Sequence, residues 1–153
     1  RGLGDVYKRQ DGTFDEKEEK ILNEFGNWMN INKEAIYQTR PWKIFGEGPI
    51  ADKDVQLNAQ GFNEWAYSKA DAKEIRFTQT DKNLYATVLG WPEDGKILIR
   101  SLAEGNGLYP TKIGRVELLG YGKVSFTRTD KGLVVDIPAK SLKNIAPVLK
   151  IRK

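Results

Sequence analysis

The side chains that could do chemistry in this chain are its acids, amines, hydroxyls and aromatic rings. The 153 residues contain no Cys and no His, which excludes disulfides, thiol nucleophiles, imidazole bases and the usual zinc ligand sets. The 21 Asp and Glu residues could include an acid and a nucleophile, whose carboxyl groups must lie about 5 to 9.5 Å apart. Most of these acids fall on one helix face or in turns, where solubility and capping explain them. We therefore assign no catalytic, cofactor-binding or metal-binding residue.

Two further motifs have a chemical interpretation. Gly46-Glu47-Gly48-Pro49 is superficially similar to a phosphate-binding loop, but the preceding strand, the following helix and the phosphate-binding Lys are missing. A turn is the better interpretation. Trp42, Trp65 and Trp91 could stack on sugar rings, because sugars present apolar C–H faces that aromatic planes accept. Core packing is the alternative for at least half of the aromatic residues.

The charge pattern limits the possible partners. The net charge is +4, but Lys and Arg are scattered among Asp and Glu, which argues against a nucleic-acid partner. No run approaches the roughly 18 apolar residues of a membrane span. The first ten residues, RGLGDVYKRQ, resemble translated adapter sequence, so we expect residues 1–10 to be non-native or artefactual.

One helix is expected near the start of the chain, over residues 13–32. Thr13 and Glu16 match the capping-box pattern, which satisfies two backbone donors at a helix start. Apolar side chains recur at helical spacing and predict a single apolar stripe. The members of the stripe are Phe14, Ile21, Leu22, Phe25, Trp28 and Met29. A lone helix of this kind needs a partner surface to be stable.

From residue 74 onward the hydrophobic period changes from 3.6 to 2, which predicts strands. We expect strands at residues 74–78, 84–90, 96–102, 115–119, 123–129, 133–137 and 148–152. They are short, turns separate them at regular spacing, and no crossover helices intervene. This pattern favours an antiparallel β-sandwich over a parallel sheet. The predicted fold is therefore mainly β, with one leading amphipathic α-helix.

Several sequence blocks resemble one family of enzymes. The end of the catalytic barrel in α-L-fucosidases of glycoside hydrolase family 29 is similar to four blocks in the same order: Gly26-Asn27-Trp28, Asn32-Lys33-Glu34-Ala35-Ile36-Tyr37, Thr39-Arg40-Pro41-Trp42 and Gly46-Glu47-Gly48-Pro49. The first strands of that family's C-terminal sandwich resemble three more: Ile75-Arg76-Phe77-Thr78, Leu84-Tyr85-Ala86 and Leu89-Gly90-Trp91-Pro92. The resemblance covers nearly everything after residue 10.

The resemblance implies a division of the chain into domains. Residues 11–40 would be the remnant of a truncated (β/α)8 barrel, a TIM barrel. The helix would be the last one of the barrel, and its apolar stripe would rest on a neighbouring barrel helix or strand. Residues 41–53 would be an interdomain connector, and residues 54–153 the C-terminal β-sandwich. The prolines would restrict the connector's backbone, and the aromatic rings would supply contact area against the barrel. The expected domain-interface residues are Trp28, Pro41, Trp42, Phe45 and Pro49.

The resemblance also implies a function. The parent protein would be a retaining exo-α-L-fucosidase, a glycosidase that hydrolyses terminal α-L-fucose from glycans through an Asp nucleophile and a carboxylic acid/base. In the family these groups lie on barrel loops upstream of residue 11, so we expect this chain alone to be inactive and structural. We expect a periplasmic or secreted bacterial protein. The alternatives are an autonomous carbohydrate-binding module without hydrolase activity and a structural interaction domain unrelated to sugars.

Overall fold

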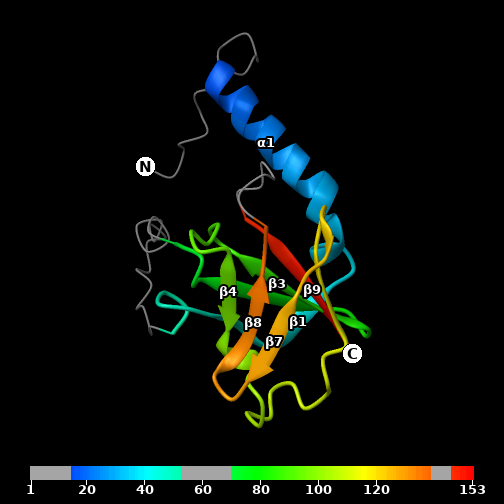
Figure 1. Ribbon diagram of the computed structural model, residues 1–153. Helices are drawn as coiled ribbons and strands as arrows, with labels where there is room; N and C mark the ends of the chain where they lie inside the picture. Colours follow the sequence, from blue (N-terminus) through cyan, green and yellow to red (C-terminus); the bar gives the residue numbers. More distant parts are fainter. Residues whose placement is uncertain (1–14, 53–69, 139–145) are drawn as a thin grey trace, which may run out of the picture.

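The computed structural model describes residues 15–52, 70–138 and 146–153, and Figure 1 shows their arrangement. Two antiparallel sheets lie face to face, and one helix projects from the sandwich with only its C-terminal end against the sheets. The predicted mainly β fold with a leading helix is confirmed. Residues 1–10, Thr13 and Phe14 lie outside the described residues, and so does Trp65.

The two sheets differ in size. The larger sheet has the strand order β1-β2-β3-β9-β5-β6, and the smaller sheet has the order β4-β8-β7. The strands are β1 (Arg40–Glu47), β2 (Ile75–Gln79), β3 (Asn83–Val88), β4 (Lys96–Ile99), β5 (Arg115–Leu118), β6 (Gly122–Lys123), β7 (Phe126–Thr129), β8 (Gly132–Asp136) and β9 (Val148–Arg152). The helical elements are α1 (Glu16–Asn32) and the 3-10 turns η1 (Lys33–Ala35) and η2 (Arg100–Leu102).

The core lies between the sheets and follows the period-2 alternation of their sequences. Ile75 and Phe77 of β2 point inward from the larger sheet, and Ile97 and Ile99 of β4 point inward from the smaller one. These side chains are at most 3% exposed and belong to one apolar cluster. Alternate residues of β2 and β4 face outward, as expected for sheets that are buried on one face.

The stretch predicted as a connector, residues 41–53, contains strand β1 instead. β1 pairs antiparallel with β2, with Arg40 opposite Gln79 and Glu47 opposite Ile75. The register shifts between Pro41 and Gly46, and such an irregularity hides the alternation that identifies a strand. Pro is tolerated because β1 is an edge strand. The larger sheet therefore begins at Arg40, before the predicted sandwich boundary at residue 54.

Two predicted strands are interrupted. The segment 123–129 divides into β6 of the larger sheet and β7 of the smaller one, so the chain changes sheets within it. The segment 96–102 continues as β4 only to Ile99 and then forms η2. Period-2 patterning does not distinguish a strand that remains in one sheet from one that crosses to the other, because both bury alternate residues.

The capping residue of α1 also differs from the prediction. Asp15 is the N-cap, and its carboxylate accepts hydrogen bonds from the backbone N–H groups of Lys17 and Glu18, each 2.8 Å long. The Glu18 side chain accepts one from the Asp15 N–H at 3.1 Å. The capping-box spacing is therefore present, but two residues after the predicted Thr13 and Glu16. A carboxylate at this place is also favoured by the helix dipole.

Candidate domain interface

The apolar stripe of α1 has two parts. Its C-terminal part lies on the outer face of the larger sheet, where Trp28 packs against a buried cluster that includes Ala35, Tyr85 and Val148. Farther toward the N-terminus, Ile21, Leu22 and Phe25 are 63%, 50% and 59% exposed. Nothing in the described part of the chain covers them.

Polar contacts hold the C-terminal end of α1 in place. The Trp28 indole Nε1–H donates to the Ala146 carbonyl at 2.8 Å, just ahead of β9. The Thr78 hydroxyl of β2 donates to the Ala35 carbonyl at 2.7 Å. Asn32 is fully buried and donates to the Trp28 carbonyl at 3.0 Å. The first bond ties α1 to the chain just ahead of β9, the second ties η1 to β2, and the third lies within the helix.

An ion pair adds to this attachment. Lys150, in the middle of β9, pairs with Glu34 of η1, and the Tyr85 hydroxyl donates to the same carboxylate at 3.2 Å. Burial, together with the negative charge of Glu34, raises the pKa of the Tyr85 hydroxyl, so it remains a donor at neutral pH. Because the end of α1 is fixed by packing and by bonds, the direction in which its exposed face points is fixed as well.

The predicted interface residues do not share one surface. Trp28 is half-buried against the sandwich. Trp42 is only 9% exposed, and its ring meets Phe77 edge to face with 5.0 Å between the ring centroids. Since Trp42 fills the sandwich core, it cannot offer its ring to another domain.

The other three predicted interface residues lie on the surface. Pro41 and Pro49 are exposed at the two ends of β1, about 20 Å or more apart at the rise of an extended strand. Phe45 is 64% exposed, with the Arg76 guanidinium carbon 5.5 Å from its ring centroid. Ile21, Leu22 and Phe25 are the most exposed part of the helix stripe, which the family resemblance implies rests on the barrel, although only Trp28 of the stripe was named as an individual interface residue.

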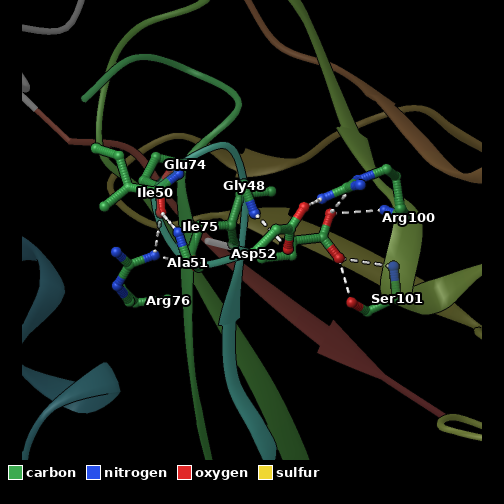
Figure 2. Close-up of polar contacts among 10 residues, drawn as sticks. Gly48, Ile50, Ala51, Asp52, Glu74, Ile75, Arg76, Arg100 and Ser101 are labelled. Carbon is green, nitrogen blue, oxygen red and sulfur yellow. Dashed lines mark hydrogen bonds and ion pairs between the residues drawn. The ribbon is translucent and has the colours of Figure 1, made fainter. Parts of the chain in front are cut away.

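Two buried acids determine the path of the chain beyond β1. Glu47 is 4% exposed, and its carboxylate accepts hydrogen bonds from the Arg100 and Ser101 N–H groups, both 2.7 Å long, and from the Ser101 hydroxyl. The donors Arg100 and Ser101, labelled in Figure 2, are the first residues of η2, so the Glu47 carboxylate binds the start of this turn. It joins the edge strand of the larger sheet to the end of β4 in the smaller one.

Glu74 holds the turn that follows Glu47. It is 1% exposed and accepts 2.8 Å hydrogen bonds from the Ile50 and Ala51 N–H groups and from Arg76 (Figure 2). Gly48 has φ +136°, and a Cβ there would lie 2.5 Å from a Glu74 carboxylate oxygen. Gly48 and Pro49 lie in a turn, as predicted, whereas Gly46 and Glu47 of the same motif belong to the end of β1. Both carboxylates are buried and bind donors of the chain itself, so their contacts hold the backbone in place.

The described residues contain neither a cluster of metal-binding side chains nor a membrane-spanning helix. Within residues 15–52, 70–138 and 146–153, no three acidic side chains gather where they could hold a metal ion. Nor does any helix in these ranges have the length and apolar character to cross a membrane. Of the Trp residues considered for sugar stacking, Trp42 is in the core, whereas Trp91 is half-buried in a surface loop.

Comparison with known proteins decides the family. A sequence model described as "Alpha-L-fucosidase C-terminal domain" matches residues 69–152, more than half of the chain. This chain belongs to that family. Among curated proteins, the plasma alpha-L-fucosidase of Rattus norvegicus is 29% identical over 81% of this chain and 22% of its own length. The tissue alpha-L-fucosidase of Macaca fascicularis is 31% identical over 79% of this chain and 20% of its own length.

The structural matches include the elements ahead of this fucosidase C-terminal domain. The Thermotoga maritima alpha-fucosidase in complex with a mechanism-based inhibitor has a TM-score of 0.61 and 25% identity, over 94% of this chain and 28% of its own. A coverage of 94% leaves about nine residues unmatched, fewer than the 25 residues of α1 and β1 together, so the match extends into these elements. The chain spans about a fifth of the length of these curated relatives.

Proposed function

We propose that this chain is the C-terminal part of a retaining exo-α-L-fucosidase that hydrolyses terminal α-L-fucose from glycans. The catalytic carboxylates would belong to a barrel domain that precedes residue 11 in the intact protein. Two findings support this: the family match, and the chain's coverage of only 20–22% of two relatives named as fucosidases. The part of the chain described here would be a structural unit that supports the catalytic domain.

The exposed helix face carries the proposed role. Complete burial of an Ile, Leu or Phe side chain contributes about 1.5–3 kcal/mol, and Ile21, Leu22 and Phe25 leave half or more of their surface in water. Their stripe continues into the buried contact of Trp28. We infer that the same stripe packs against the catalytic domain, so that α1 joins the two domains. Pro41, Phe45 and Pro49 remain proposed contacts on the sandwich side.

The proposed location is the periplasm or the cell exterior, where fucosylated glycans are accessible. One relative is named as a plasma fucosidase. No helix in the described residues is long and apolar enough to cross a membrane, which is compatible with this location.

The enzymatic part of the proposal is tested on the protein with its natural upstream sequence. We expect that longer protein to release nitrophenol from an aryl α-L-fucoside, and the 153-residue chain to show no turnover. Turnover by the short chain would contradict the proposed division of labour. An inactive longer protein with no barrel ahead of residue 11 would instead favour the alternative, a carbohydrate-binding module.

The interface role is tested in the same longer protein with a matched pair of charge insertions. Phe25→Glu places a charge on the exposed apolar face, whereas Asn27→Glu places the same charge on the polar side of α1. Loss of the apolar contact and burial of a carboxylate predict a weakening of domain docking by about 3 kcal/mol or more. Calorimetry should show a lower transition temperature for Phe25→Glu only. Equal transitions for the two variants would refute the interface.

A further inference from the structure

A surface hollow of about 1030 Å³ lies beside the loop that follows β3. Its lining includes Asp52 and Arg100, the ion pair visible in Figure 2, together with Asp71, Trp91, Glu93 and Leu98. The volume is at the upper end of the range typical of small-molecule sites. Leu98 is 46% exposed although it lies in β4, so the hollow has an apolar wall as well as charged ones.

Trp91 is held firmly at this hollow. The preceding Gly90 lies against the backbone of Asp71, where a Cβ would come within 2.8 Å of the Asp71 carbonyl carbon. One side of Trp91 packs on the sandwich core. Its Nε1 is shielded from solvent and has no hydrogen-bond partner in the described structure. An unpaired buried donor reduces stability, so packing alone does not explain why the residue is Trp.

The same loop also borders a second hollow, of about 570 Å³. Trp91, Pro92, Glu93 and Asp94 line both. The loop therefore contributes to two concave surfaces. A chain of sugar rings could extend along both, whereas a single small ion would occupy only one.

The charges of the larger hollow select the class of ligand. Its carboxylates are those of Asp52, Asp71, Glu93 and Asp94, and its cations are those of Lys73, Lys96 and Arg100. Asp52 and Arg100 neutralise one another at 2.5 Å, and the remaining groups are close to balance with a slight acidic excess. Anionic ligands are disfavoured by this excess. Hydroxyl groups, which both donate and accept, match a mixed set of acceptors and donors.

We propose that the hollow beside Trp91 binds a neutral oligosaccharide. Trp91 and Leu98 meet the apolar C–H faces of the rings, and the carboxylates and cations bond the hydroxyl groups. The inference goes beyond the proposed hydrolase function and does not depend on it, because it concerns only groups of this chain. It assigns a role to the Trp91 position, which core packing explains only in part.

The test is an NMR titration of the 153-residue chain with methyl α-L-fucopyranoside, lactose and maltotriose, and separately with inorganic phosphate. The Trp91 indole resonance is identified by its absence in Trp91→Phe. We expect at least one sugar to shift this resonance and the backbone resonances of residues 90–94 saturably, with a millimolar dissociation constant. Phosphate should leave them unchanged.

Matched variants locate the site. Glu93→Gln removes a carboxylate from the hollow, and Glu104→Gln makes the same change at an exposed position in a loop that does not line it. We expect Glu93→Gln to weaken sugar binding at least threefold and Glu104→Gln to leave it unchanged. A near-UV circular dichroism spectrum equal to the parent's shows that each variant is folded. The proposal is overturned if no sugar binds, if only phosphate binds, or if both variants have the same effect.

Discussion

Replacing Trp42 with Ala distinguishes two accounts of the strand that opens the sandwich. If Trp42 belonged to a domain interface, its removal would leave the 153-residue chain by itself unchanged. In the structure, however, its ring is buried in the sandwich and meets Phe77 edge to face, with the ring planes inclined at 65°. The chain by itself should therefore lose stability when the ring is removed.

The magnitude follows from the burial of the ring. Truncation of a buried Trp or Phe to Ala costs about 3–5 kcal/mol, because contacts are lost and a cavity remains. For a domain of this size each kcal/mol lowers the melting temperature by about 2–4 °C, so the expected decrease is roughly 6 to 20 °C. The measurement is a thermal and a urea melt of the 153-residue chain followed by circular dichroism.

Phe45→Ala is the matched control, because Phe45 is an aromatic residue of the same strand but is 64% exposed. We expect it to change the free energy of unfolding by less than about 0.5 kcal/mol, as for most surface positions. If Trp42→Ala also changes the stability by less than about 1 kcal/mol, compared with the 3–5 expected from burial, the assignment of Trp42 to the core is refuted.

Two further predictions concern polar groups. The Arg128 guanidinium donates to four backbone carbonyls, those of Leu102, Ala103, Tyr109 and Thr111. Lys cannot reproduce this fork, so Arg128→Lys should cost about 2–4 kcal/mol in a urea melt, while the exposed control Arg115→Lys should cost almost nothing. The second prediction is a pH effect. The hydrogen bond from Arg100 is the main cause that lowers the pKa of Asp52 below 3.8, although slight burial opposes it. Because the folded-state pKa is the lower one, this stabilisation is present above pH about 4 and is lost as the pH falls through the folded-state value. Urea midpoints measured against pH should show this loss in the parent chain, and Asp52→Asn should lack that component.

The sequence predicted the elements in which one pattern dominates. The apolar stripe identified α1, and period-2 alternation located β2, β3, β5, β8 and β9 to within two residues. β1 was missed because a proline near its start and the register shift before Gly46 interrupt the alternation. Its strand character depends on pairing with β2, which is 28 or more residues later in the chain, and local sequence does not encode such a contact.

The sequence also did not reveal which residues of β1 face the core, for a related reason. Trp42 and Phe45 are both large aromatic residues in a Pro- and Gly-rich stretch, and composition alone gives them the same role. The structure places them on opposite faces of one strand, with 9% and 64% of their surfaces exposed. The register of β1 with β2 decides which side chains of β1 face the core. The register shift between Pro41 and Gly46 hides this pattern in the sequence, as it hides the strand itself.

Residues from the other end of the sequence anchor the helix to the sandwich. β9 lies between β3 and β5 in the larger sheet, and the chain from Ala146 into β9 also provides two anchors for the helix end: the Ala146 carbonyl for Trp28, and Lys150 for Glu34. These partners are 118 and 116 residues apart in the sequence. The orientation of α1 therefore depends on the completed sheet. A face that points in a fixed direction can dock as a rigid unit, without the loss of entropy that a flexible linker would add on association.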